Sequence, residues 1–113
     1  MSKRDELAAK YAKSLDEKVK VTVDENKMLG IIKACGPSIY RADSETVSAS
    51  DPQEMDRVKN GFIKKHLGLE GEAADKALDN AIERYGRSNT HKYRACLYYL
   101  LADEAGKLDD FAA

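Results

Sequence analysis

The stretch ACLYYLLA, residues 95–102, is apolar around most of the circumference that a helix would give it. It lies inside a predicted helix over 89–105, for which Ser88 is the expected N-cap and Gly106 the expected end. A helix that is apolar nearly all round is buried on more than one side. The stretch therefore predicts either the central helix of an all-α domain or a helix with a second, partner-binding face.

Four further helices are predicted upstream, because apolar residues recur there at three- and four-residue spacing. Asp24 and Asp51 are well placed as N-caps, and Pro52 takes a first helical position. Glu54 can complete a capping box with Asp51. Gly68 can adopt the left-handed conformation that often ends a helix. The predicted helices span residues 3–18, 25–35, 52–66 and 72–85.

The connections between these helices are short, except for residues 37–50. The segment VKVTV, residues 19–23, alternates with a period of two, but a single short strand cannot form a sheet. We interpret it as an extended linker whose valines dock on the core. The chain is thus predicted to be all-α, a single compact domain of about five helices with one long ordered loop. This domain covers residues 1–106 and is followed by an acidic C-terminal tail over 107–113.

The long loop has two interpretations, a binding loop or packing between two helices. Connections beyond ~12–15 residues are uncommon in compact domains and are often functional. Against this, Asp43 can cap a turn, and Val47 can anchor the segment to the core. Asp51 also places negative charge at the next helix start, which disfavours an anion there. The loop residues of interest are Ser38, Tyr40, Asp43, Ser48, Ser50 and Asp51.

The composition of the chain disfavours several classes of function. The 113 residues include 35% charged side chains, but the formal net charge of −1 counts against strong binding to nucleic acid. The charged N-terminus is unlike a signal peptide and no apolar run could span a membrane, so we expect a cytoplasmic protein without membrane contact. Cys35 and Cys96 are interpreted as buried, reduced thiols. We identify no catalytic residue and no metal-ligand spacing, and we expect no cofactor.

Positive charge gathers in the middle of the chain, where residues 57–94 have a net charge of +4. The basic segment RVKNGFIKKH, residues 57–66, is interpreted as the solvated face of its helix. In RYGRSNTHKYR, residues 84–94, the first turn of the last helix has no acidic residue and is surrounded by cations, contrary to what the helix dipole favours. This conflict predicts an anion site, whereas the alternative is that the cations only face water. The candidate residues are Arg84, Arg87, Ser88, Asn89, Thr90, Lys92 and Arg94.

The apolar face of the last helix predicts self-association, because so wide a face should not stay exposed on a monomer. Its expected contact residues are Tyr98, Tyr99 and Leu101. The leading hypothesis is therefore a small non-enzymatic interaction module that forms a homodimer or binds a protein partner. The alternative is an anion- or nucleic-acid-binding domain that uses the basic start of the last helix. For an enzyme, the third class, the sequence offers no catalytic residues.

Three phrases of the sequence resemble a known family. They are MSKRDELAAKYAKSL at residues 1–15, GPSIY.ADS.TVSASDP at 36–52 and KYRA..YYLL at 92–101. Over about residues 1–105 the chain resembles the bacterial domain of unknown function family 2853. The resemblance implies a small cytoplasmic bacterial protein and transfers no catalytic or binding residue. Since the second phrase covers the long loop, the resemblance adds interest to that loop without deciding between packing and binding.

Overall fold

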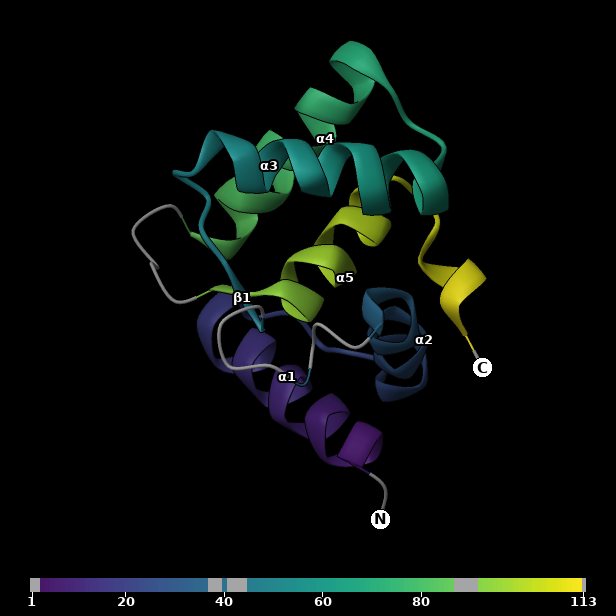
Figure 1. Cartoon of the computed structure of the whole chain (residues 1–113). Helices are drawn as coiled ribbons and strands as arrows, with labels where there is room; N and C mark the ends of the chain where they lie inside the picture. The colour runs from purple at the N-terminus through teal and green to yellow at the C-terminus, as the bar shows by residue number, and fades with distance from the viewer. Residues whose placement is uncertain (1–2, 37–39, 41–44, 87–91, 113) are drawn as a thin grey trace.

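The computed structural model describes residues 3–36, 40, 45–86 and 92–112 and is mainly helical (Figure 1). Its α-helices are α1 (Lys3–Val19), α2 (Glu25–Cys35), α3 (Pro52–Val58), α4 (Gly71–Tyr85) and α5 (Arg94–Glu104). The other described elements are the π-helix η2 (Lys59–Leu67), the 3-10 helix η3 (Leu108–Phe111) and the strands β1 (Thr46–Val47) and β2 (Lys92–Tyr93). The predicted all-α, single-domain fold is confirmed, with a Cα radius of gyration of 12.7 Å.

Helix α5 lies at the centre of the fold, as its apolar stretch predicts (Figure 1). The helices α1, α2, α4, η2 and η3 all contact it. Every residue from Ala95 to Ala102 is buried. Because burying one large apolar side chain contributes about 1.5–3 kcal/mol, α5 supplies a large part of the hydrophobic stabilisation.

The helices α1, α2 and α4 form where the apolar spacing predicts them. The N-cap of α2 is Asp24, whose side chain accepts a hydrogen bond of 3.0 Å from the backbone N–H of Asn26. The predicted linker over 19–23 is only partly right, because Val19 is the last residue of α1 and Lys20 turns the chain with φ +62°. The valines pack half-buried against the core as expected; they are Val19, Val21 and Val23.

The helices α3 and η2 form one continuous helical segment. It starts as predicted, because the Asp51 side chain accepts from the backbone N–H of Gln53 at 3.0 Å. The predicted capping box is wrong: the backbone N–H of Asp51 donates to the carbonyl of Ser48, and Glu54 pairs with Arg94 instead. The segment leaves α-geometry at η2, and π-helical turns are rare and occur frequently at functional sites.

The end of η2 follows the prediction made from Gly68. This glycine has φ +69° and lies in the left-handed region. The backbone N–H of Leu69 then donates to the carbonyl of Ile63 at 3.3 Å, which closes the helix in the manner of a Schellman motif. The turn sets the direction in which the chain enters α4, which packs beside η2.

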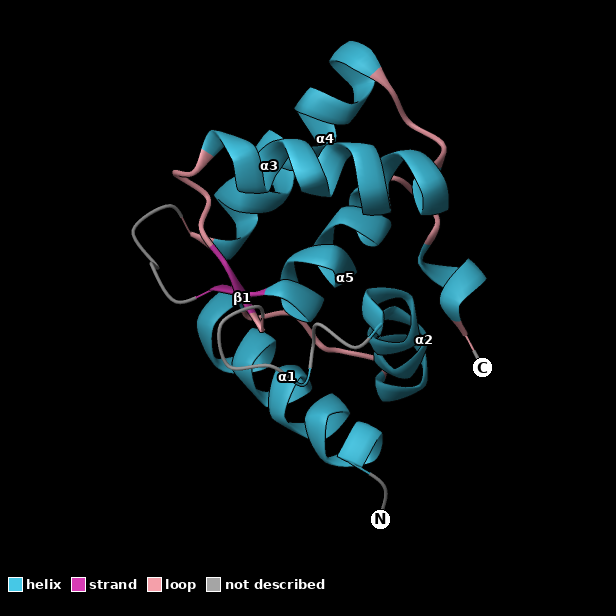
Figure 2. Ribbon diagram, in the orientation of Figure 1, coloured by secondary structure: helices cyan, strands magenta, loops and turns pink. Residues whose placement is uncertain are grey.

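A two-strand ladder joins the long loop to the start of α5 (Figure 2). Strand β1 pairs antiparallel with β2, with Thr46 opposite Tyr93. The last helix therefore begins at Arg94, with Tyr93 at its N-cap position, and Lys92 and Tyr93 are not helical as the prediction over 89–105 required. The reason is that the residues just before Arg94 satisfy their backbone groups through strand pairing, which a helix would exclude. The predicted N-cap, Ser88, lies outside the described residues.

The predicted acidic tail is in part a docked element rather than a free end. Leu108 and Phe111 in η3 pack half-buried against the core. The Lys27 ammonium lies 2.6 Å from the carboxylate of Asp109, which ties η3 to α2. Contact with α2 is close at Gly30, where an added Cβ would lie 1.8 Å from the Phe111 carbonyl oxygen. Because Gly30 has no side chain, the C-terminal segment can pack against α2 at this position.

Candidate functional site

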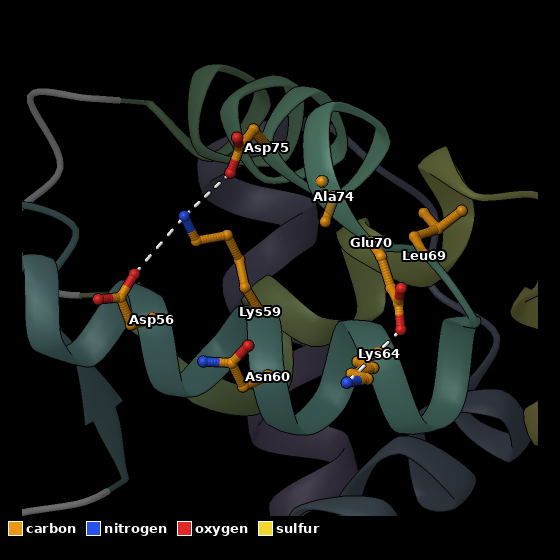
Figure 3. A pocket seen from close by; sticks show the side chains of 9 residues that line it. Asp56, Lys59, Asn60, Lys64, Leu69, Glu70, Ala74 and Asp75 are labelled. Atoms are coloured by element: carbon orange, nitrogen blue, oxygen red, sulfur yellow. Dashed lines mark hydrogen bonds and ion pairs between the residues drawn. The ribbon is translucent and has the colours of Figure 1, made fainter.

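A hollow of about 400 Å³ between η2 and α4 contains charges that are matched to one another (Figure 3). The Lys59 ammonium lies 2.9 Å from Asp75 and 3.6 Å from Asp56, and the hydrogen bond to Asp75 raises the pKa of Lys59. The Lys64 ammonium lies 3.5 Å from Glu70. Since three carboxylates and two ammonium groups line this paired-charge pocket, it has no surplus positive charge for an anion.

A second hollow, the cationic pocket, has a volume of about 300 Å³ and lies between the end of α2, the α3–η2 segment and the start of α5. These parts of the chain are far apart in sequence and meet because α2 and η2 both pack on α5. The basic lining residues are Arg57, Lys65, His66 and Arg94. The others are Ala34, Cys35, Gly61, Phe62 and Tyr98, so no carboxylate is among the described lining residues.

Arg94 is held in the cationic pocket by the side chains of Tyr98 and Glu54, among others. Its Nη1 donates to the Tyr98 hydroxyl at 3.1 Å, and its Nη2 donates to the carboxylate of Glu54. The side chains of Arg94 and Glu54 are each 13% exposed, so water screens their attraction only weakly. Burial lowers the pKa of Arg94, but the bonds to Tyr98 and Glu54 outweigh it and raise the pKa above its ordinary value. The guanidinium is therefore charged and fixed in orientation.

Positive charge in the cationic pocket exceeds what Glu54 neutralises. This carboxylate is shared, because its second oxygen lies 3.4 Å from Nη1 of Arg57 while its first pairs with Arg94. The Arg57 side chain is 73% exposed, so it can reorient toward a ligand. Lys65 is exposed and has no ion-pair partner in the part of the chain that the structure describes. Among the described residues, one carboxylate stands against three permanent cations, a balance that favours an added anion.

Gly61 keeps one wall of the cationic pocket bare. It lies inside η2, where glycine is less favourable than alanine by roughly 0.5–1 kcal/mol. Its φ is not in the positive region, and a Cβ at this position would meet no atom within 4 Å. The fold therefore does not require glycine here, whereas the missing side chain leaves the pocket open.

Cys35 brings a half-buried thiol to the cationic pocket. Burial raises the pKa of Cys35 to about 12, although the nearby Arg94 charge acts in the opposite direction. The thiol is therefore protonated at neutral pH, and a protonated thiol is a poor nucleophile. The arrangement suits anion binding better than thiolate catalysis.

Among residues 3–36, 40, 45–86 and 92–112, no helix has the length and apolar character needed to cross a membrane. Nor do three or more His, Cys, Asp or Glu side chains from these ranges come together where they could hold a metal ion. The cationic pocket is thus described by charge and shape alone.

A scan against protein-family models matches residues 10–109 to the family described as "Protein of unknown function (DUF2853)". The chain belongs to this family. The resemblance noted in the sequence is therefore confirmed, while a search of curated proteins gives no match. All residues that line the cationic pocket fall inside the matched range, so the pocket is part of the DUF2853 domain.

The residues of the anion site predicted at 84–94 occupy different surroundings in this DUF2853 domain. Arg84 pairs with Asp103 at 2.8 Å and with Glu104 at 2.9 Å, near the far end of α5. Lys92 is buried, with only 2% of its surface exposed. Among the described candidates, Arg94 alone lines the cationic pocket. The candidates outside the described residues are Arg87, Ser88, Asn89 and Thr90.

The predicted self-association face lies inside the DUF2853 domain. Tyr98, Tyr99 and Leu101 are all buried by the chain's own elements. The ring of Tyr98 stacks on Phe62 with 4.2 Å between centroids, and the Tyr99 hydroxyl accepts from the backbone N–H of Asp24 at 3.0 Å. The exposed apolar face on which that prediction relied is therefore absent from the described structure, because the surrounding helices cover it.

The described part of the long loop mainly has structural tasks. The hydroxyls of Ser48 and Ser50 lie 3.2 Å apart, and Asp51 caps α3. Val47 is buried and anchors the segment, as predicted. Tyr40 differs, because it is 49% exposed beside a shallow hollow at the end of α2. The remaining residues of interest, Ser38 and Asp43, lie outside the described residues.

Most of the cationic pocket was not predicted from the sequence. Arg57, Lys65 and His66 were interpreted as a solvated face, and Cys35 as a core residue. The signals that point to them are the excess of positive charge over residues 57–94 and a glycine inside a helical pattern at position 61. An isolated glycine inside a helical pattern costs about 1 kcal/mol relative to alanine, which draws attention to position 61.

Proposed function

We propose that this DUF2853 protein binds a small-molecule anion, with a phosphate or carboxylate group, in the cationic pocket. The observation that supports it is the lining itself: three permanently charged cations and a histidine, with no carboxylate among the described lining residues. The volume of about 300 Å³ is at the lower end of the range for small-molecule sites. Arg94 is already oriented by Tyr98 and Glu54, which reduces the entropy lost on binding.

Two other functions have weaker support. The interaction-module hypothesis loses its proposed contact, because Tyr98, Tyr99 and Leu101 are covered within the chain. Nucleic-acid binding normally requires a strong basic excess, and the net charge is −1. A cytoplasmic location stays a prediction, which two free cysteines favour.

The test is calorimetric titration of inorganic phosphate at low ionic strength into the protein and two charge-reversal variants. Lys65→Glu changes a residue of the cationic pocket, whereas Lys64→Glu changes its neighbour in the paired-charge pocket. Both variants alter the net charge by the same amount, and both side chains are exposed. We expect phosphate affinity to fall about tenfold or more for Lys65→Glu, since about 1.4 kcal/mol corresponds to tenfold. Lys64→Glu should bind nearly as tightly as the unmodified protein.

Two results would refute the proposal. One is the absence of phosphate binding to the unmodified protein at millimolar concentration. The other is an equal loss of affinity in Lys64→Glu and Lys65→Glu, which would mean that only the overall charge of the surface matters.

A further inference from the structure

The cationic pocket continues into another hollow of about 430 Å³, which we call the C-terminal pocket. The two share the lining residues Ala34 and His66, so they adjoin each other. The additional walls of the C-terminal pocket are Gly30 and Lys33 on α2 and Asp110, Phe111 and Ala112 at the end of the chain. A ligand that enters one hollow can therefore extend into the other.

The two hollows differ in charge. The C-terminal pocket has one cation, Lys33, and one carboxylate, Asp110, beside its histidine, so its permanent charges cancel. Apart from these, its lining is glycine, alanine and the ring of Phe111. The cationic pocket suits an anionic group, and the C-terminal pocket suits an uncharged body with aromatic or apolar surface.

Aromatic rings form a continuous contact across the boundary between the hollows. The His66 ring centroid lies 5.5 Å from that of Phe62 and 6.3 Å from that of Phe111. The Phe62 and Phe111 rings are stacked at 5.7 Å. Rings at these separations leave faces and edges on which a further flat group can pack.

The outer wall of the C-terminal pocket is fixed before any ligand arrives. The Lys27–Asp109 ion pair and the close approach of Phe111 to Gly30 hold η3 against α2. Small-molecule sites are usually pre-formed in this way. The C-terminal segment, which the sequence predicted to be a tail, is thus a wall of a site.

From this arrangement, and resting on the proposed anion binding, we infer that the natural ligand is bipartite. Its phosphate or carboxylate group contacts Arg57, Lys65 and Arg94, and an attached aromatic or short apolar body lies over Ala34 and His66 against Phe111. The two volumes together fit a small molecule rather than a polymer. Asp110 also repels a polyanion that would follow the groove.

The experiment compares phenyl phosphate with inorganic phosphate by NMR titration of the full chain. We expect phenyl phosphate to bind about tenfold more tightly, because its ring buries apolar surface that inorganic phosphate lacks. Only phenyl phosphate should shift the backbone amides of Phe111 and Ala112. Phe111→Ala should remove the advantage of phenyl phosphate and leave the affinity for inorganic phosphate unchanged, while Phe111→Leu keeps part of it.

The outcomes separate the two proposals. If neither compound binds, anion binding itself fails, and the bipartite ligand with it. If both bind with equal affinity and no shift reaches Phe111 or Ala112, anion binding stands and the bipartite ligand is refuted. A short single-stranded oligonucleotide that binds more tightly than phenyl phosphate would also refute it, in favour of a polyanion. The amide shifts of the unmodified protein decide the question even if Phe111→Ala does not fold.

Discussion

Position 61 allows the electrostatics of the cationic pocket to be tested without any ligand. We consider Gly61→Glu and Gly61→Gln, which have side chains of nearly the same shape and differ in charge. A side chain at this position starts in open space, so neither variant meets a steric obstacle at its Cβ. Both also gain from replacing a helical glycine, and this gain cancels when the two are compared. The difference in their stability therefore reports the interaction of a carboxylate with the pocket.

The size of that difference follows from the charges that line the pocket. Three permanent cations face it, and Glu54 is the carboxylate that the described residues place against them, which leaves positive charge in surplus within the described part of the chain. An exposed ion pair contributes about 0.2–1 kcal/mol, so the glutamate variant should be more stable than the glutamine variant by about 1 kcal/mol at low salt. In 1 M salt the screening length falls to about 3 Å, and the difference should nearly disappear.

The assay is urea unfolding of both variants at low salt and in 1 M salt, with linear extrapolation to water. Phosphate binding provides a second measure, because the tethered carboxylate of Gly61→Glu should compete with phosphate while the amide of Gly61→Gln should not. Equal stability of the two variants at low salt, or a more stable glutamine variant, would show that the pocket has no surplus positive charge.

Three further predictions concern the fold around the site. Gly30→Ala should lower the free energy of unfolding by about 1–3 kcal/mol, because the new Cβ would overlap the η3 backbone. Urea unfolding measures this loss, and an unchanged unfolding midpoint would contradict the close packing of η3 on α2. Arg94→Met should cost roughly 2–4 kcal/mol by leaving the weakly solvated Glu54 carboxylate with a poorer partner, and a loss below about 0.5 kcal/mol would mean that the pair contributes little. Burial raises the pKa of Cys35 and of Cys96 from 9.0 to about 12, so the folded protein retains thiol protons that the unfolded chain loses between these values. Stability should therefore be complete below about pH 9 and fall above it by about 1.4 kcal/mol per pH unit for each thiol, which is nearly 3 kcal/mol for the two together. The fall should be about half as steep in Cys96→Ala, and a stability curve that is flat from pH 9 to 11 would refute the burial of the thiols.

Local sequence signals were sufficient for most of the fold. The spacing of apolar residues located α1, α2 and α4, and capping chemistry located the starts of α2 and α3 at Asp24 and Asp51. These features depend on residues within one or two turns of each other, which is why a sequence displays them. The apolar stretch over 95–102 likewise indicated the central place of α5, because the lack of a polar face leaves no side for water.

The sequence predictions were wrong where contacts between distant residues override the local conformational preference of the chain. The start of α5 was misplaced because β2 pairs with β1, and two residues are too few to show a period of two. The C-terminal segment showed no helical period, yet η3 docks on α2 because Gly30 makes room for it. Similarly, Glu54 was predicted to serve its own helix, whereas the fold brings Arg94 to it from 40 residues away.

Most of the candidate site could not be predicted from the sequence, for the same reason. Arg94 was identified from the charge at the start of the last helix, but the Arg57 and Lys65 side chains look like any solvated helix face. Only packing of α2 and η2 on α5 brings these cations around one hollow with Cys35 and Tyr98. A pattern in one helix cannot reveal a site that three elements form together.

Anion binding in the cationic pocket can be tested by an amide-resolved NMR titration with inorganic phosphate, at low and at physiological salt. We expect salt-sensitive shifts at Gly61, Lys65 and Arg94, with little change at Lys59 and Asp75 in the paired-charge pocket. Shifts centred on Lys59 and Asp75, or no saturable shift at Gly61, Lys65 and Arg94, would contradict this expectation.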